Sequence, residues 1–325
     1  MANVGSMGEP GLLVTARAGD GDAFRELVAP HLPALQLHCY RMLGSYHDAE
    51  EVMQDVLLRA WRYLDGYREQ APLLHWLYRI ATTTSLKAIE ARAKLPGTVA
   101  EIDYLEPYPD RLLDALPADS DPAAAAERRE SVSLAFISAL QLLPATQRAV
   151  VILREVLVWR ADEVAALLDT TVAAVNSMLQ RARATLGSAD SRRSLDAEDR
   201  RVLARFVDAW HRRDIPGLAE LLRADVELRM PPDTLEVFGR DEVLAFLTTA
   251  PLEGAFDAIH LEQTRANGQP ATFAFHPDEA GGHFPYGIMV FRLEGGGVRE
   301  IMAFPGVLER AGLKAAFQVG PGEIG

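Results

Sequence analysis

Between residues 171 and 183, amide, hydroxyl and guanidinium side chains recur at a spacing that would gather them on one face of a helix. That face carries small or hydrogen-bonding residues and no acid. Asn and Gln can pair with adenine edges, Arg with guanine or phosphate, and Ala can lie against a thymine methyl. The pattern therefore suits contact with DNA bases. The candidate residues are Thr171, Ala173, Ala174, Asn176, Ser177, Gln180, Arg181 and Arg183.

The elements that must position this face are two short helices joined by a tight turn. Residues 172–186 have apolar side chains at steps of three and four, and residues 161–168 have a similar stripe. Asp169-Thr170 supplies the turn, and Thr171 can cap the second helix. This layout predicts a helix-turn-helix whose second helix enters the major groove. The alternative is an ordinary pair of surface helices in an α-helical domain.

A second helical pattern covers residues 48–61, where an apolar face lies opposite a polar one. On pattern alone, a polar stripe of this kind is by default a face exposed to solvent. Its polar residues are Asp48, Glu51, Gln54, Asp55 and Arg59.

Aromatic residues lie beside hydroxyl groups and cations in the helical segment from residue 76 to residue 87. Every base offers a face on which an aromatic ring can stack, worth about 1–3 kcal/mol, so this combination suits unpaired bases. The alternative is that the aromatic rings anchor a core, and we expect this of at least one of Trp76 and Tyr78. The candidate group is Trp76, Tyr78, Arg79, Thr82, Thr83 and Lys87.

Charge and composition limit the class of protein. The chain of 325 residues has a net charge of −13, which is unusual for a protein that binds nucleic acid unaided. Cys39 is the only cysteine, which excludes an intrachain disulfide and a multi-cysteine zinc site and suggests a buried structural thiol. No apolar run approaches the ~20 residues of a membrane helix, and no signal peptide is evident. We therefore expect a cytoplasmic protein with no membrane partner.

The excess acid lies outside the segments suited to DNA. Residues 96–127 hold eight acids, one arginine and several prolines, which predicts an extended, flexible linker. Helical patterns cover residues 12–95 before it and 128–187 after it, and the latter carries seven arginines against five acids. A short polar bridge, residues 188–194, then leads to a segment of different character.

Residues 195–318 show helical patterns first and strand patterns later, which is typical of an α+β fold. Asp214 is placed to cap a helix that begins at Ile215-Pro216, and Asn267-Gly268 suits a hairpin turn. Helices are predicted at 196–213, from 215 and near 240–247, and strands at 226–230, 258–266, 271–276, 286–293 and 298–304.

Residues 12–187 resemble the extracytoplasmic-function (ECF) group of bacterial sigma factors, the promoter-recognition subunits of RNA polymerase. The resemblance rests on several motifs in the right order: Asp48-Ala49-Glu50-Glu51, Gln54-Asp55, Leu58-Arg59-Ala60-Trp61, Trp76-Leu77-Tyr78-Arg79-Ile80-Ala81-Thr82, Leu143-Pro144, Gln147-Arg148, Val172 to Ser177, and Gln180 to Arg183. It implies that residues 12–95 bind core polymerase and melt the −10 element, and that residues 128–187 recognise the −35 element. The polar face of residues 48–61 then contacts polymerase, the group from Trp76 to Lys87 the −10 element, and the helix after Thr171 the −35 element.

Residues 195–318 resemble the SnoaL-like superfamily of cone-shaped barrels. Met230-Pro231-Pro232, Gly239-Arg240 and the segment from Thr264 to Ala271 carry this resemblance. The superfamily includes cyclases and isomerases, whose chemistry needs a carboxylate or His base inside an apolar cone. His260, His276 and His283 lie on or near the predicted strands, and the sequence does not say which of them point inward.

The predicted fold is therefore multidomain: two all-α helical domains, the second a helix-turn-helix, followed by an α+β SnoaL-like cone-shaped barrel. We expect a sigma factor that directs core RNA polymerase to promoter DNA and is regulated in cis by its C-terminal domain. No catalytic residue, metal or cofactor is predicted. The alternative is a SnoaL-type enzyme or ligand-gated repressor that carries a DNA-binding module. The promoter sequence, the activating signal, a small-molecule ligand of the C-terminal domain and a separate inhibitor protein stay open.

Overall fold

The computed structural model describes residues 8–94, 105–116, 130–186, 197–231, 233, 235–249, 258–277 and 283–319. The chain divides into two compact units. The first unit holds residues 1–44, 48–98 and 143–187. The second holds residues 45–47, 99–142 and 188–325, so the segment between the two helical patterns groups with the C-terminal part of the chain.

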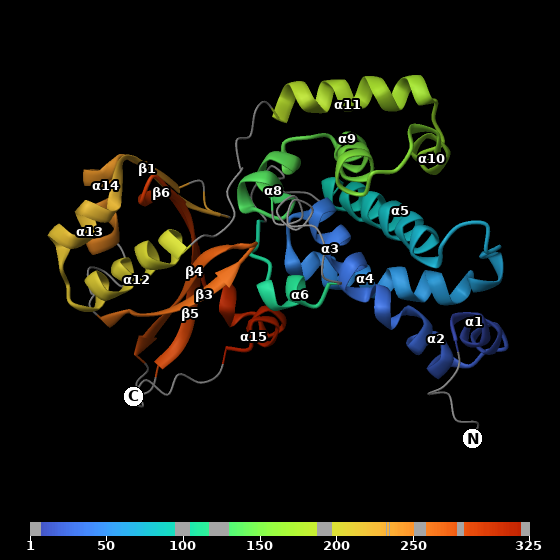
Figure 1. The fold of residues 1–325 in the computed structure, drawn as a ribbon, viewed down its shortest axis with the longest axis horizontal. Coiled ribbons are helices and arrows are strands. Elements are labelled where there is room, and N and C mark those ends of the chain that lie inside the picture. Colours follow the sequence, from blue (N-terminus) through green and yellow to red (C-terminus); the bar gives the residue numbers. More distant parts are fainter. Residues whose placement is uncertain are drawn as a thin grey trace. The chain divides into compact units, whose positions relative to one another are not determined.

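The first unit is helical, and its helices begin and end where local chemistry dictates (Figure 1). Asp20 caps one helix by accepting hydrogen bonds from the N–H groups of Asp22 and Ala23. Gly44, with φ of 75°, ends another in the left-handed conformation that glycine tolerates. The helices are α1 (Glu9–Arg17), α2 (Gly21–Val28), α3 (Leu32–Leu43), α4 (Tyr46–Arg62), α5 (Leu73–Ala93), α9 (Ala145–Val151), α10 (Ala161–Leu167) and α11 (Val172–Leu186), with a π-helical turn at Ile152–Val156. The first two residues of α4 group with the second unit.

A buried arginine fixes α9 against the end of α3. Arg148 is only 2% exposed, and its guanidinium group donates to the carbonyl oxygens of Met42 (2.5 Å) and Leu143 (3.2 Å). Hydrogen bonds of this kind offset the cost of burying the charge. Arg148 belongs to one of the sequence motifs quoted above. In the structure it holds α9, the helix on which α11 packs, against the end of α3.

The second unit is built on a six-stranded sheet with the order β2-β1-β6-β5-β4-β3. β1 and β6 run parallel, whereas all other neighbours are antiparallel. The strands are β1 (Leu222–Met230), β2 (Leu235–Phe238), β3 (His260–Ala266), β4 (Gln269–Pro277), β5 (His283–Glu294) and β6 (Gly297–Pro305). The helices are α6 (Asp110–Asp114), α8 (Leu134–Gln141), α12 (Ala197–His211), α13 (Ile215–Leu221), α14 (Arg240–Thr249) and α15 (Ala311–Phe317).

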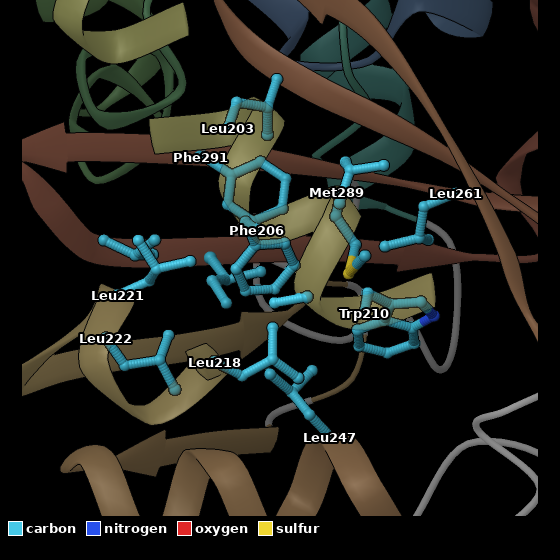
Figure 2. Close-up of a cluster of buried hydrophobic side chains, with 14 of the residues drawn as sticks. Leu203, Phe206, Trp210, Leu218, Leu221, Leu222, Leu247, Leu261, Met289 and Phe291 are labelled. Carbon is cyan, nitrogen blue, oxygen red and sulfur yellow. The ribbon is translucent and has the colours of Figure 1, made fainter. Parts of the chain in front are cut away.

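Helix α12 supplies the centre of the core in this unit. Figure 2 shows Phe206 and Trp210 of α12 among Met289 and Phe291 of β5 and several leucines. The rings of Phe206 and Phe291 pack edge to face, with centroids 5.1 Å apart. The α+β fold predicted from residues 195–318 is confirmed.

Local predictions in this unit succeed where a turn or cap residue is specific. Asp214 Oδ1 accepts a hydrogen bond from the Gly217 N–H (2.9 Å), which confirms the cap. Asn267 and Gly268 both have positive φ, 56° and 70°, as a tight hairpin turn requires. The strand β2 is not predicted, because this four-residue edge strand is largely exposed and shows no alternation of buried and exposed residues.

The segment predicted as an extended linker differs in part from that prediction. Residues 105–116 are ordered: Leu105 and Tyr108 are buried, and Pro109 forms an isolated β-bridge with Ala266 of β3. The composition of a segment indicates only how much apolar surface that segment can bury by itself. Here residues 105–116 are ordered because they pack against a distant part of the chain, around Ala266 and Asn267. The remainder of the predicted linker, residues 96–104 and 117–127, lies outside the described residues.

Candidate functional site

The helix-turn-helix places the predicted reading face on the surface. In α11 the buried residues are Val175, Leu179 and Ala182, at steps of four and three, and α11 packs on α9 and α10 (Figure 1). Thr171 Oγ1 accepts a hydrogen bond from the Ala174 N–H (3.1 Å), which confirms the predicted cap. The stripe of buried residues therefore fixes the orientation of α11, and the opposite face of the helix is exposed.

The outer face of α11 retains the side chains that suit DNA. Arg181 donates to Ser177 Oγ (2.8 Å), and Arg183 pairs with Glu155 (2.6 Å). A phosphate would therefore compete with Glu155 for Arg183, whereas Arg181 is held by a neutral hydroxyl. The exposed residues of the predicted group are Thr171, Ala173, Asn176, Ser177, Gln180, Arg181 and Arg183, and Ala174 is half-buried.

The polar face predicted on α4 is also at the surface. Glu51, Gln54 and Asp55 are exposed, and Arg59 is half-buried. Asp48 is half-buried and forms an ion pair with Arg92 of α5, so it also ties the two helices together.

An exposed apolar residue on α4 is absent from the predicted group. Leu58 is 64% exposed and lies four residues after Gln54 and three after Asp55, which puts it on their face. A large apolar side chain surrounded by polar groups is typical of a protein-binding surface. The sequence could have revealed this residue, because Leu58 is apolar but does not lie on the apolar stripe formed by Val52, Val56 and Ala60.

The group predicted on α5 divides into two faces. Arg79, Thr83 and Lys87 are exposed and Trp76 is half-buried, at steps of three and four that give one surface stripe. Trp76 and Arg79 line a hollow of about 520 Å³, whose lining also includes Asp162 and Glu163 of α10. These four α5 residues form one surface suited to nucleic acid.

Tyr78 and Thr82 correct the prediction, because both face the core of the helical unit. Tyr78 is 7% exposed and packs edge to face on His38 (5.1 Å) and Trp159 (6.4 Å). Thr82 is fully buried, donates to the carbonyl of Tyr78 (2.8 Å) and lies 2.9 Å from His38 Nε2. Burial lowers the pKa of His38 to about 3, so this imidazole is neutral near pH 7. Neither residue is accessible to DNA in this structure.

The single cysteine, Cys39, lies in the core of the helical unit. Cys39 is fully buried, and burial raises the pKa of its thiol to about 12. Because the thiolate is the reactive form, this thiol is inert near neutral pH. The expectation of a buried structural thiol is confirmed.

A polar contact between the β3–β4 turn and the segment before α8 is the most specific feature of the second unit. Asn267 is fully buried, and its Oδ1 accepts from the Tyr108 N–H while its Nδ2 donates to the Val132 carbonyl, both at 2.7 Å. Its own N–H donates to the Tyr108 carbonyl (2.9 Å). One side chain thus binds two points of the chain that lie 24 residues apart in sequence. We call this contact the linker clamp.

Further bonds extend the linker clamp on both sides of Asn267. Asp110 accepts from the Gly268 N–H (2.7 Å) and pairs with Arg265 (2.7 Å). Gln269 Oε1 accepts from the Leu134 N–H (2.8 Å) at the start of α8. Local sequence patterns do not reveal these partners, because each pair is more than 130 residues apart along the chain.

Glu106 forms a second buried polar centre in the same unit. Its carboxylate is 5% exposed and accepts from Ser45 Oγ and the His47 N–H, both at 2.9 Å. It also forms an ion pair with Arg310. Residues 45–47, the linker segment and the C-terminal helix are therefore joined through one carboxylate.

The interior of the sheet offers no catalytic base among the described residues. A cavity of about 120 Å³ is lined by apolar side chains, with Trp210 and Tyr286 as the residues that carry polar atoms. Trp210 Nε1 already donates to the Ile259 carbonyl (2.9 Å). No carboxylate or imidazole belongs to the described lining.

The three strand histidines lie outside that cavity lining. His260 stacks on His211 with ring centroids 4.5 Å apart, and burial and the neighbouring His211 lower the pKa of His260. The ring centroids of His283 and His260 lie 6.3 Å apart. His276 packs against Phe284 and Tyr286. In the part of the chain that the structure describes, no group of His, Cys, Asp and Glu could hold a metal, and no helix is long and apolar enough to span a membrane.

Comparison with known families agrees with this division of the chain. Residues 27–95 match the Sigma-70 region 2 model, residues 133–186 match the Sigma-70, region 4 model, and residues 203–301 match the SnoaL-like domain model. The chain thus combines the two promoter-recognition regions of a sigma factor with a SnoaL-like domain.

Relatives cover most of the chain. The ECF RNA polymerase sigma factor SigG of Mycobacterium tuberculosis (strain ATCC 25618 / H37Rv) is 38% identical over 311 residues, which span 89% of this chain and 82% of that protein. The ECF RNA polymerase sigma factor SigW of Bacillus subtilis (strain 168) is 28% identical over 52% of this chain and 90% of its own length. The crystal structure of the M. tuberculosis ECF sigma factor SigJ has the same fold, with a TM-score of 0.59 at 23% identity over 85% of this chain and 94% of that one.

The chain belongs to the ECF sigma factors. Proteins of this family bind core RNA polymerase and promoter DNA, start transcription and are not enzymes. The predicted family, fold class and general function are confirmed, and the alternative of a SnoaL-type enzyme or ligand-gated repressor is set aside.

Proposed function

We propose that the SnoaL-like domain regulates this sigma factor in cis by holding the connection between its two promoter-recognition regions. The observation that carries the proposal is the linker clamp. Region 2 ends near residue 95 and region 4 begins near residue 133. Asn267 binds Tyr108 and Val132, and Gln269 binds Leu134, so the clamp holds the middle and the end of this connection.

The physical consequence concerns the distance between the two regions. A connection of 37 residues that is free can reach a wide range of separations, whereas one held at residues 105–116 and 132–134 cannot. Simultaneous binding to the −10 and −35 elements requires one particular separation. The clamp therefore biases which promoter spacings the protein can serve, or whether it can engage a promoter at all.

The arrangement inside the helical unit supports a role for such control. Trp76 and Arg79 belong to the surface assigned to the −10 element, and Asp162 and Glu163 of α10 line the same hollow. Carboxylates there would repel DNA phosphates, so engagement of the −10 element favours movement of α10 away from α5. Because the linker clamp restricts how far the two regions can separate, it would also restrict the movement of α10 away from α5.

We assign the polymerase-binding surface to the exposed face of α4 and the −35 surface to the outer face of α11. The −10 surface is assigned to Trp76, Arg79, Thr83 and Lys87. We propose a cytoplasmic location as well, because core polymerase and promoter DNA are cytoplasmic in bacteria. We also propose that the apolar cavity within the sheet accepts a small apolar ligand.

Alanine substitutions on α11 test the −35 assignment. Asn176→Ala, Gln180→Ala and Arg181→Ala are expected to weaken promoter recognition by about 1–3 kcal/mol each where a base contact is lost. Footprinting of the polymerase holoenzyme on cognate and −35-substituted promoters gives the measurement. Thr185→Ala, an exposed hydroxyl at the end of the same helix, is the control. If all three variants keep full preference for the cognate −35 element, the outer face of α11 does not recognise it.

A further inference from the structure

A polar cavity of about 590 Å³ lies where the linker segment meets the sheet. Pro109, Asp110, Arg111 and Asp114 of the linker form part of its lining. The rest comes from α12, β3, β4 and the end of α15. This volume is within the range of pockets that bind small molecules, about 300–1,000 Å³.

The lining has more positive than negative groups. Three arginines, Arg111, Arg200 and Arg265, accompany two aspartates. Asp110 is already paired with Arg265 and with the Gly268 N–H. Arg111 donates to backbone carbonyls of α15, which leave its charge uncompensated.

Arg200 is the cation most available to a ligand. It is exposed, and no hydrogen bond or ion pair of its side chain is found within the described part of the chain. Leu203, three residues further along α12, contributes an apolar surface to the same cavity, as do Pro270 and Phe317. Guanidinium groups bind carboxylates and phosphates through two parallel hydrogen bonds.

We propose that this cavity binds a small organic anion, a carboxylate or phosphate monoester carried on an apolar body. Arg200 holds the anionic group, Arg111 adds a further positive charge to the same lining, and Leu203, Pro270 and Phe317 contact the body. A cationic ligand would meet a lining whose net formal charge is positive.

Binding in this cavity is coupled to the linker clamp. The lining is complete only while the linker segment lies on the sheet, because four of its residues belong to that segment. A ligand that contacts both the linker segment and the sheet binds more tightly when the linker clamp is formed than when the linker segment is released. It therefore stabilises the linker clamp. This coupling rests on the proposed regulation in cis, and it makes the anion a signal that keeps the connection in place.

Calorimetric titration of the full chain with benzoate and with phenyl phosphate tests the site. Saturable binding of at least one anion is expected, and the two probes distinguish a carboxylate from a phosphate ligand. Arg200→Gln should weaken binding about tenfold or more, since a charge-assisted bond is lost. Arg205→Gln, an exposed arginine on α12 outside the lining, should bind as the unmodified chain does. Binding that Arg200→Gln leaves unchanged, or no saturable binding of either anion, overturns the site.

Hydrogen exchange tests the coupling. The amides of Tyr108 and Gly268 donate to Asn267 and Asp110, so their exchange reports release of the linker. The bound probe should slow both amides by a factor close to one plus the ratio of probe concentration to Kd. Unchanged exchange at saturation overturns the coupling. That result is distinct from failure of the proposed regulation, which is measured by transcription in Asn267 variants without any probe.

Discussion

Replacing Asn267 by glycine is expected to release residues 105–116 and to change transcription from the cognate promoter several-fold. Glycine keeps the positive φ of 56° that the turn requires, so the hairpin itself remains. The side-chain bonds to Tyr108 and Val132 are lost, which leaves a buried N–H and a buried carbonyl without these partners. An unmade buried hydrogen bond costs about 1–3 kcal/mol. The clamp should therefore weaken by about 3 kcal/mol, on the order of a hundredfold in its opening equilibrium.

Two measurements check this prediction. Hydrogen exchange of Tyr108 and Gly268 should accelerate in Asn267→Gly, and multi-round transcription with core polymerase should rise or fall several-fold. Glu294→Gly serves as the control, because it puts a glycine beside the β5–β6 turn, away from the linker segment. Faster exchange with unchanged transcription on promoters of every spacer length would refute regulation through the clamp. Unchanged exchange would refute the clamp itself.

Substitutions on the exposed face of α4 are expected to reduce the affinity for core polymerase by about tenfold to a hundredfold. Leu58→Asp puts a charge where we infer that an apolar side chain is buried on binding, and Asp55→Arg reverses a charge on the same face. Loss of a central anchor at a protein interface costs about 2 kcal/mol or more, and like charges brought together cost a similar amount. The affinity is measured by titration of labelled protein with core polymerase.

Matched variants separate this effect from general damage. Val14 of α1 is 67% exposed, close to the 64% of Leu58, so Val14→Asp makes the same chemical change elsewhere on the helical unit. Glu26→Arg reverses an exposed acid on α2. Both controls should bind polymerase normally. Equal losses in Leu58→Asp and Val14→Asp would mean that α4 holds no particular docking surface.

The sequence predicts the helices of the first unit and the strands of the second because those elements depend on local patterns. The buried positions of α11, the caps at Thr171 and Asp214 and the Asn267-Gly268 turn all follow from spacing and residue type within a few positions. The same reasoning fails for α5. That helix packs against both α3 and α9, so its buried surface is wider than one stripe and includes Tyr78 and Thr82.

The linker clamp could not be predicted in this way. Asn267 is recognisable as a turn residue, yet its partners Tyr108 and Val132 are 159 and 135 residues away. The acidic, proline-rich composition of residues 96–127 predicts a segment without its own core. It does not indicate that Tyr108 and Asp110 are buried through contacts with the distant β3–β4 turn.

Run-off transcription tests the central claim most directly. Genomic DNA is transcribed by core RNA polymerase with and without this protein, and the 5′ ends of the transcripts are mapped. We predict new transcripts that share one −35 and one −10 sequence and that appear only when both components are present. The free chain, with a net charge of −13, should bind the same DNA weakly at physiological salt. Tight, sequence-specific binding by the free chain together with no new transcript from the holoenzyme would contradict its function as a sigma factor.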